Sequence, residues 1–304
     1  LLRNRSGGWE SHRWTVLESG DRLTLFGRAA RATTAASWLD SMAGYRAPAQ
    51  NMLVADRQGT IAIRSTGRFP IRPSGRGDQV QRGDRAGSDW VGDWPLAALP
   101  QALAPAQGYL ASANQQPIDP AVDARYLGAN WYSPWRAIRI NQLLRADSAV
   151  TPDAMRRYQT DPGSPAADLF VPAFLAAAAK FPERDSVARA ARLLAEWDRR
   201  YTKDNRRAVL YEAAMRALGD RLWDELDPAR AGGALPSPGW AVTARLLHDS
   251  TGPWWDVRAT PDLREDRDRL LADALAAALP EVIARHGEPD AGGWRWDRVR
   301  HANI

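Results

Sequence analysis

The alternation of apolar and polar positions predicts a β-hairpin near residue 55, which is the clearest local element of the sequence. Residues 51–55 and 60–64 each have the composition of a strand, and the polar stretch 56–59 that joins them ends in a glycine. In the second strand Ile61 and Ile63 alternate with smaller or polar residues, so we expect these two side chains to share the buried face.

The rest of the first part has the pattern of short strands and loops around one helix. Residues 14–18 and 108–112 are rich in β-prone side chains and predict strands, whereas residues 28–42 predict a helix. Residues 67–92 are rich in glycine, arginine, aspartate and serine, which predicts a long loop. Long loops in compact domains often have a functional role.

Beyond about residue 130 the apolar residues recur at helical spacing. Thr151-Pro152-Asp153 combines an N-cap, a proline at the first helical position and an early acid, and residues 260–262 repeat this signal. We expect a long helix over residues 263–286, broken near Pro280 and ended by Gly287. The second part of the chain is therefore predicted to be mainly helical.

The composition excludes several classes of protein. The chain has 304 residues, 44% of them hydrophobic, and no run approaches the roughly 18 apolar residues of a membrane span. The absence of cysteine rules out disulfides, cysteine-ligated metals and thiol nucleophiles. The 41 basic and 36 acidic residues give a net charge of +5, and they are interspersed as on an ordinary protein surface. Aspartates also interrupt the one basic cluster, at residues 64–85, so we expect no nucleic-acid partner.

Motifs of common enzyme classes are absent. The sequence has no Walker A loop, no dinucleotide-binding glycine motif, no nucleophile elbow and no zinc-protease motif. The four histidines lack metal-ligand spacing. Residues 248–250 contain the residue types of a catalytic triad, but adjacent residues cannot easily adopt its geometry.

The 14 tryptophans are many for a chain of this length. Trp14, Trp38 and Trp197 fall in apolar patterns and are expected in the core. Trp131 and Trp135 lie among polar loop residues, so they are the better candidates for lining a pocket.

The order of several segments is more informative than any one of them. The segments are Trp14–Glu18, Gln50–Gly59, Gly67–Arg72, Asp89–Gly92, Gly108–Gln115, and the run from Tyr126 through Trp131 to Ile140. In this order and spacing they resemble the β-chain of the penicillin acylase (penicillin amidase) family, from about residue 13 to the end of the chain. The helical part resembles the family more weakly.

The resemblance implies an N-terminal-nucleophile hydrolase with an αββα layered fold and a large helical region. Residues 1–130 would form the strand-rich part of the hydrolase core, and residues 131–304 the mainly helical part of the same β-chain. Such enzymes are made as precursors that cleave themselves, and the new N-terminal serine then attacks an amide carbonyl. Its own α-amine acts as the base, which suits the ordinary pKa of such an amine, about 7.7–8.0. No cofactor is required for this chemistry.

The resemblance also assigns roles to two residues. Asn114 matches an asparagine whose side-chain amide stabilises the oxyanion in the family, and Gln115 stands where many members have a second asparagine. Arg136 matches an arginine of the active-site polar network, whereas Arg139, one turn along, matches no functional position. Taken without the resemblance, Asn114 is a turn residue at the end of a strand and Arg136 is a helix-surface arginine.

Asp123 resembles a calcium-ligating aspartate of some members, and a hard carboxylate oxygen suits calcium. The resemblance thus implies a structural Ca²⁺, whose other side-chain ligands would lie outside this chain.

One departure from the family concerns the nucleophile, because Leu1 cannot serve as one. We therefore expect the sequence to be an internal piece of a larger acylase, inactive by itself, with its nucleophile segment upstream. Its partners would be a small-molecule amide substrate, the α-chain and the remaining β-chain segments of the same precursor. Penicillin-like and N-acyl amides both fit as substrates, and family habit favours the periplasm or secretion. The alternative is a degenerate, non-catalytic ligand-binding homologue on the same scaffold.

Overall fold

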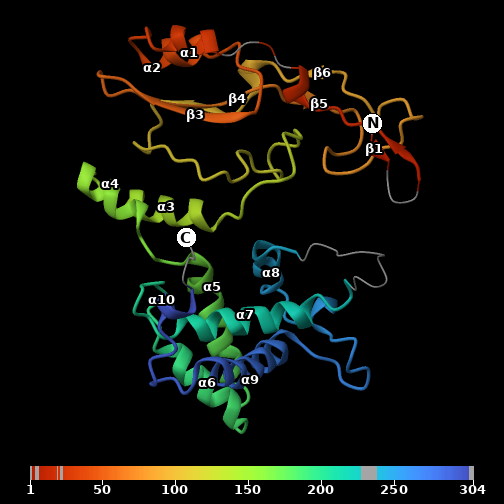
Figure 1. The fold of residues 1–304 in the computed structure, drawn as a ribbon, viewed down its shortest axis with the longest axis vertical. Coiled ribbons are helices and arrows are strands. Elements are labelled where there is room, and N and C mark those ends of the chain that lie inside the picture. Colours follow the sequence, from red (N-terminus) through yellow and green to blue (C-terminus); the bar gives the residue numbers. More distant parts are fainter. Residues whose placement is uncertain (1, 4–6, 19, 21–22, 227–237, 301–304) are drawn as a thin grey trace. The chain divides into compact units, whose positions relative to one another are not determined.

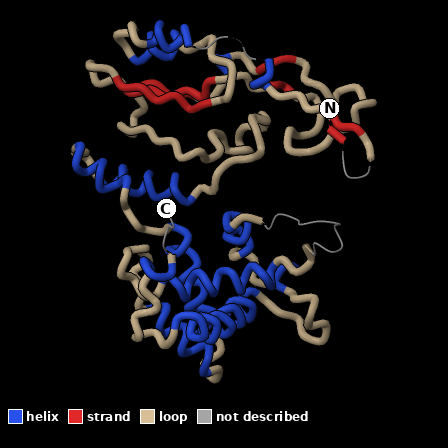
Figure 2. Tube along the Cα trace, viewed as in Figure 1, coloured by secondary structure: helices blue, strands red, loops and turns tan. Residues whose placement is uncertain are grey.

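The computed structural model describes residues 2–3, 7–18, 20, 23–226 and 238–300 (Figure 1). Leu1, whose identity bears on the nucleophile, lies outside these residues. The chain divides into two compact units, Leu1–Ala137 and Ile138–Ile304, and each is described by itself. All strands of the described residues belong to the first unit, and the second is built from helices and loops (Figure 2).

A three-stranded antiparallel sheet forms the centre of the first unit. Its strands are β3 (Gln50–Ala55), β4 (Ile61–Thr66) and β7 (Gln101–Leu103), in the order β3-β4-β7. The predicted hairpin is therefore confirmed, and Gly59 adopts a φ of +86° in its turn, a conformation that favours glycine. Strand β7 lies on the other edge of β4 and was not predicted, because it is only three residues long and carries no alternation of its own.

Two pairs of very short strands complete the sheet structure of this unit. They are β1 (Leu2–Arg3) with β2 (Trp9–Glu10), and β5 (Pro70–Ile71) with β6 (Gly92–Asp93). The second pair lies inside the stretch predicted to be a loop, which otherwise consists of turns and bends.

Two short helices, α1 (Leu23–Ala29) and α2 (Ala35–Ser41), cover one face of the hairpin (Figure 1). The residues buried between the helices and the sheet include Leu25, Leu39, Met42, Met52 and Ala62. The buried residue among Ile61, Ala62 and Ile63 is thus Ala62, and the expectation that Ile61 and Ile63 face the core was wrong; both are half-buried. The small alanine leaves room for the helices to lie close to the strand.

Three further local predictions for this unit were wrong. Residues 15–18 form a 3₁₀ helix rather than a strand, and the expected helix over 28–42 is interrupted at residues 30–34, between the end of α1 and the start of α2. Residues 108–112 pair with no strand among the described residues. A β-prone composition predicts a strand only where a neighbouring edge is available, and tertiary context decides that.

Helix α3 (Trp135–Ala146) spans the boundary between the units. The helices that follow are α4 (Pro152–Gln159), α5 (Pro165–Ala178), α6 (Asp185–Ala195), α7 (Ala208–Leu222), α8 (Trp240–Leu246), α9 (Arg267–His286) and α10 (Trp296–Val299). Besides the 3₁₀ helix at residues 15–18, two further 3₁₀ turns occur in the described residues, at Leu96–Ala98 in the first unit and at Pro253–Trp255 in the second. Helix α9 packs against α5, α6 and α7, and fully buried side chains such as Phe170, Leu218 and Leu275 fill this core.

Of the two predicted helix starts, the one at residues 151–153 was confirmed and the one at residues 260–262 was wrong. The hydroxyl of Thr151 accepts a hydrogen bond from the Ala154 N–H and caps α4 as predicted. Residues 260–262 start no helix; α9 begins at Arg267 with Asp266 as its N-cap. It continues through Pro280 and ends before Gly287, which has a φ of +78°. In the described part of the chain, no helix has the length and apolar character needed to cross a membrane.

Candidate functional site

The loop that carries Asn114 makes a tight turn stabilised by its own side chains. Asn114 has a φ of +63°, a left-handed conformation that asparagine tolerates better than most residues. The side-chain oxygen Oε1 of Gln115 accepts a hydrogen bond from the buried Ala113 N–H at 2.7 Å. The Tyr132 N–H donates to the Asn114 carbonyl oxygen at 3.0 Å, which fastens the turn to the segment before α3. Asn114 is thus a turn residue, and its side chain remains exposed.

Arg136, in the first turn of α3, reaches back to this loop. Its Nη2 donates to the Ala113 carbonyl oxygen at 2.9 Å and to the Asn114 side-chain oxygen Oδ1 at 3.0 Å. The guanidinium carbon also lies 5.5 Å from the centre of the Tyr132 ring, within cation–π range. The structure therefore brings together Asn114 and Arg136, which lie 22 positions apart in the sequence.

The contact with Arg136 decides how the Asn114 amide is oriented. A guanidinium has only donors, so the atom of Asn114 that faces it must be the oxygen Oδ1. The amide nitrogen Nδ2 then points away from Arg136, and no described residue accepts a hydrogen bond from it. An exposed, oriented N–H donor of this kind is the group that an oxyanion hole requires.

Side chains of the hairpin hold the start of the same loop. The amide Nδ2 of Asn51 on β3 donates to the Ser112 hydroxyl at 2.9 Å. The Ser65 hydroxyl, opposite it on β4, donates to Asn51 Oδ1 at 2.7 Å. Ser65 is buried, so this Ser65–Asn51–Ser112 chain is a structural support rather than a surface contact. It was not predicted from the sequence, because Asn51 and Ser65 are only two of several polar residues in the hairpin strands, beside Gln50, Arg64 and Thr66.

Arg139, one turn after Arg136, is part of an ion-pair cluster in the second unit. Its Nε donates to Asp161 Oδ1 at 2.6 Å, and Arg200 Nη2 donates to Asp161 Oδ2 at 2.9 Å. The hydrogen bond from Arg139 is the main reason why the pKa of Asp161 lies well below its usual range. Arg139 therefore has a structural partner and is not a neutral control for Arg136.

Asp123, the candidate calcium ligand, is bound by Arg125. The Arg125 Nε lies 2.9 Å and 3.0 Å from the two carboxylate oxygens, the Nη2 also donates, and the Arg125 N–H donates at 3.1 Å. The side-chain and then the backbone hydrogen bonds of Arg125 lower the pKa of Asp123 to about 2. The described residues include no group of three or more His, Cys, Asp or Glu side chains that could hold a metal ion. Asp123 is thus paired with Arg125 among the described residues, and the calcium, whose other side-chain ligands were expected outside this chain, remains a prediction.

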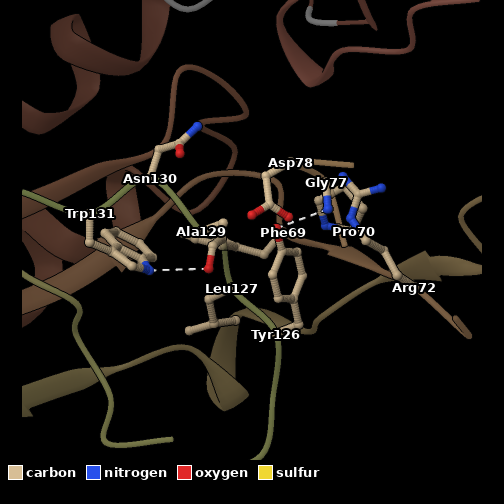
Figure 3. Close-up of a pocket in the computed structure, with 11 residues that line it drawn as sticks. Phe69, Pro70, Arg72, Gly77, Asp78, Tyr126, Leu127, Ala129, Asn130 and Trp131 are labelled. Atoms are coloured by element: carbon tan, nitrogen blue, oxygen red, sulfur yellow. Dashed lines mark hydrogen bonds between the residues drawn. The ribbon is translucent and has the colours of Figure 1, made fainter. Parts of the chain in front are cut away.

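The tryptophans were assigned partly correctly. Trp197 is buried, as expected, and Trp38 packs partly buried against the core of the first unit. Trp14 is half exposed, so its assignment to the core was wrong. Trp131 lines a cavity, as predicted, and its indole N–H donates to the Gly128 carbonyl oxygen at 3.1 Å (Figure 3). Trp135 is half-buried, and its indole nitrogen has no hydrogen-bond partner among the described residues.

Several known proteins are similar in sequence to this chain over most of its length. The model of one family, penicillin amidase, matches residues 3–304. The chain is 31% identical to acyl-homoserine lactone acylase QuiP of Pseudomonas aeruginosa over 97% of its length, which covers 36% of that protein. It is 28% identical to the penicillin acylase 2 proenzyme of Pseudomonas sp. (strain SE83), over 84% of this chain and 33% of that one. The chain thus spans about a third of the length of the curated relatives it matches.

The fold is also similar to that of a solved structure. Thermostable penicillin G acylase from Alcaligenes faecalis matches with a TM-score of 0.67 and 19% sequence identity, over 91% of this chain and 53% of that one. This likeness confirms the predicted α/β (α+β) class, with the fold of an N-terminal-nucleophile hydrolase.

Proposed function

Because the chain belongs to the penicillin amidase family, we propose that its protein hydrolyses a non-peptide amide and releases a carboxylic acid and an amine. The hydrogen bond from Arg136 to Asn114 Oδ1 is the observation that carries this proposal. It leaves the Asn114 amide N–H free to donate, which is what the tetrahedral intermediate of acyl transfer needs.

The proposed reaction has two steps. The hydroxyl oxygen of an N-terminal serine, upstream of Leu1 in the precursor, attacks the amide carbonyl carbon while its own α-amine takes the hydroxyl proton. The carbon–nitrogen bond then breaks, and the proton passes to the leaving amine. Water next hydrolyses the acyl ester, which frees the acid and regenerates the serine. In both steps negative charge develops on the carbonyl oxygen, and Asn114 Nδ2 donates a hydrogen bond to it.

Arg136 is proposed as a positioning residue. By binding Oδ1 of Asn114 and the carbonyl oxygen of Ala113, its guanidinium fixes both the side chain and the backbone of the turn. Its permanent positive charge also favours the developing oxyanion nearby.

The substrate class and processing are proposed from the names of the relatives. An acyl-homoserine lactone acylase and a penicillin acylase both act on N-acyl amides, so we infer an N-acyl amide substrate for this protein. One relative is named a proenzyme, which supports a self-cleaving precursor whose other segments assemble with this chain. A periplasmic or secreted location is also proposed, because members of the family are usually found there.

The test is the substitution Asn114→Ala in the full-length protein. Loss of one oxyanion donor lowers kcat by about 10²–10³, and KM changes much less because the donor acts on charge that develops in the transition state. The matched control is Gln116→Ala, two residues along and also exposed, which has no hydrogen bond among the described residues. Hydrolysis of a chromogenic acyl-anilide measures both. If Asn114→Ala kept more than about a third of the kcat of the unsubstituted protein, against that expected loss, Asn114 would be only a turn residue.

A further inference from the structure

A cavity of about 320 Å³ lies in the first unit, between the segment that follows β4 and the segment before α3. Its size is at the lower end of the range for small-molecule sites. Figure 3 shows its lining, which combines aromatic rings with a few polar groups. The side chains that give the cavity its character are Phe69, Arg72, Asp78, Tyr126 and Trp131.

The aromatic part of the lining comes from both segments. Phe69 is almost fully buried, and Tyr126 and Trp131 are half-buried. The Tyr126 hydroxyl accepts a hydrogen bond from the Gly77 N–H at 2.9 Å, and the Trp131 indole is held by the Gly128 carbonyl. These contacts fix two of the three rings, so the apolar surface is formed before any ligand arrives.

Arg72 provides the charge of this cavity. Its guanidinium carbon lies 5.3 Å from the centre of the Trp90 ring and 5.9 Å from that of Tyr126. In the residues that the structure describes, no carboxylate pairs with Arg72 and no hydrogen bond involves its side chain. This half-buried guanidinium is thus held by two aromatic rings and keeps its donors available.

The neighbouring arginines differ from Arg72 in this respect. Arg13 and Arg68 lie beside the same Trp90 ring, but both form ion pairs. Arg13 pairs with Glu18 and Asp89 at 2.7 and 2.5 Å, and Arg68 with Glu18 and Asp93 at 2.6 and 2.7 Å, where each distance joins a guanidinium nitrogen to a carboxylate oxygen. Of the three arginines beside Trp90, the one that lines the cavity is therefore the one without a carboxylate partner among the described residues.

The one acidic residue of the lining, Asp78, does not neutralise Arg72. Its two carboxylate oxygens accept from Nε and Nη2 of Arg76 at 3.1 and 3.2 Å, in a bidentate pair. With Asp78 and Arg76 cancelling, the charge of Arg72 remains, and the cavity favours an anion.

Gly77 keeps the space that Arg72 occupies. A Cβ atom built on Gly77 would lie 2.9 Å from Arg72 Nη2 and 3.3 Å from the Tyr126 hydroxyl. Any larger residue at position 77 must therefore displace the guanidinium, and this provides a second way to perturb the site.

We propose that this cavity is a binding site for a small carboxylate with an aryl group. The guanidinium of Arg72 binds the carboxylate through two parallel N–H donors, a geometry that lysine cannot provide. The rings of Phe69, Tyr126 and Trp131 pack against the aryl group. The proposal does not rest on the proposed amide hydrolysis, because the ligand contains no amide and binding requires no turnover.

The test is calorimetric titration of the full-length protein with 3-phenylpropanoate, and with 3-phenylpropan-1-ol as a ligand of the same shape without the charge. We expect saturable one-to-one binding of the acid and at least about tenfold weaker binding of the alcohol, as for the loss of hydrogen bonds to a charged group. Butanoate, which has the carboxylate without the ring, is also expected to bind more weakly.

Three substitutions test the role of Arg72. Arg72→Met removes the donors and keeps the aliphatic length, Arg72→Lys keeps the charge without the fork, and Gly77→Ala displaces the guanidinium. Each is expected to weaken 3-phenylpropanoate binding, Arg72→Met by about tenfold or more. The control Arg57→Met changes an exposed arginine of the hairpin turn, and binding should be unaffected.

The outcomes separate this inference from the proposed function. Normal binding by Asn114→Ala, together with its loss of hydrolysis, would agree with both. Retained hydrolysis in Asn114→Ala would contradict the proposed role of Asn114 and leave the carboxylate site intact. No binding at about 1 mM ligand, equal binding of acid and alcohol by the unsubstituted protein, or full affinity in a folded Arg72→Met variant would each overturn the carboxylate site.

Discussion

Replacing Arg136 with methionine tests whether this arginine acts through Asn114. The substitution removes the donors to Asn114 Oδ1 and to the Ala113 carbonyl oxygen and keeps the aliphatic part of the side chain. A hydrogen bond to a charged group contributes about 1.5–3 kcal/mol. Arg136 and Asn114 are both exposed, so the lower value applies, and about 1.5 kcal/mol favours the productive amide orientation by roughly tenfold.

This magnitude sets the expected loss of activity. Without Arg136, the two orientations of the amide become nearly equal, and the productive one falls from about nine-tenths of the population to about half. Population alone then lowers kcat about twofold, and loss of the nearby positive charge adds to this. We expect a total decrease of about 3–20-fold, which is smaller than the 10²–10³ expected for Asn114→Ala. Arg136→Lys should lie between Arg136→Met and the unsubstituted protein, with slower self-cleavage of the precursor.

The assay is a double-mutant cycle on kcat for a chromogenic acyl-anilide. If Arg136 acts by orienting Asn114, the roughly twofold part of its effect that comes from amide orientation should disappear in an Asn114→Ala background, so that only the effect of its charge remains there. Arg145→Lys, an exposed change in the last turn of the same helix, is the control, because Arg139 pairs with Asp161. Fully additive losses in the double variant would refute the reasoning and assign Arg136 an effect independent of Asn114.

Two further predictions concern the loop and the second unit. Gln115→Ala should lower the free energy of unfolding by about 1 kcal/mol, measured with urea against Gln116→Ala, because the buried Ala113 N–H loses its acceptor. Asp161→Asn should destabilise the protein at pH 7 and progressively less as the pH falls below the unfolded-state pKa. The folded-state pKa of Asp161 lies below its unfolded value of about 3.9, so its contribution is complete above that value and lost as the pH falls further. Thermal melts from pH 7 to 2 measure this, and Asp262→Asn, an exposed aspartate of the same unit, should follow the unsubstituted protein throughout.

The elements that could be predicted from sequence are those whose signals are local. The hairpin was predictable because the turn glycine and the two β-prone runs lie within the 14 residues 51–64, and helix α4 was predictable from its cap. Strand β7 depends on the free edge of β4, about 40 residues earlier, and its own three residues carry no pattern. The face of β4 was assigned wrongly because hydrophobicity favours isoleucine, whereas the fit beneath two helices favours alanine.

The candidate site shows the same division. The family resemblance identified Asn114 and Arg136 one at a time, but only the structure shows that they contact each other. The role of Gln115 was not predictable, because the acceptor that it provides is used within the loop rather than toward a substrate. Arg125 lies only two residues from Asp123, so the sequence made it a possible partner of this carboxylate. The sequence does not say, however, whether a carboxylate binds an arginine or a metal ion.

The Ser65–Asn51–Ser112 chain has a consequence for how this part of the molecule changes over evolution and temperature. The loop before Asn114 is joined to the sheet by side chains, with no backbone ladder over residues 108–112. Such a loop opens locally at a free energy below that of global unfolding. The donor geometry can therefore be lost while the sheet and helices remain folded, and it can be adjusted by substitutions at residues 51, 65 or 112 that touch no substrate. A substitution in this unit can therefore disturb the Asn114 donor without unfolding the unit, although strands β3 and β4 support both the loop and the fold.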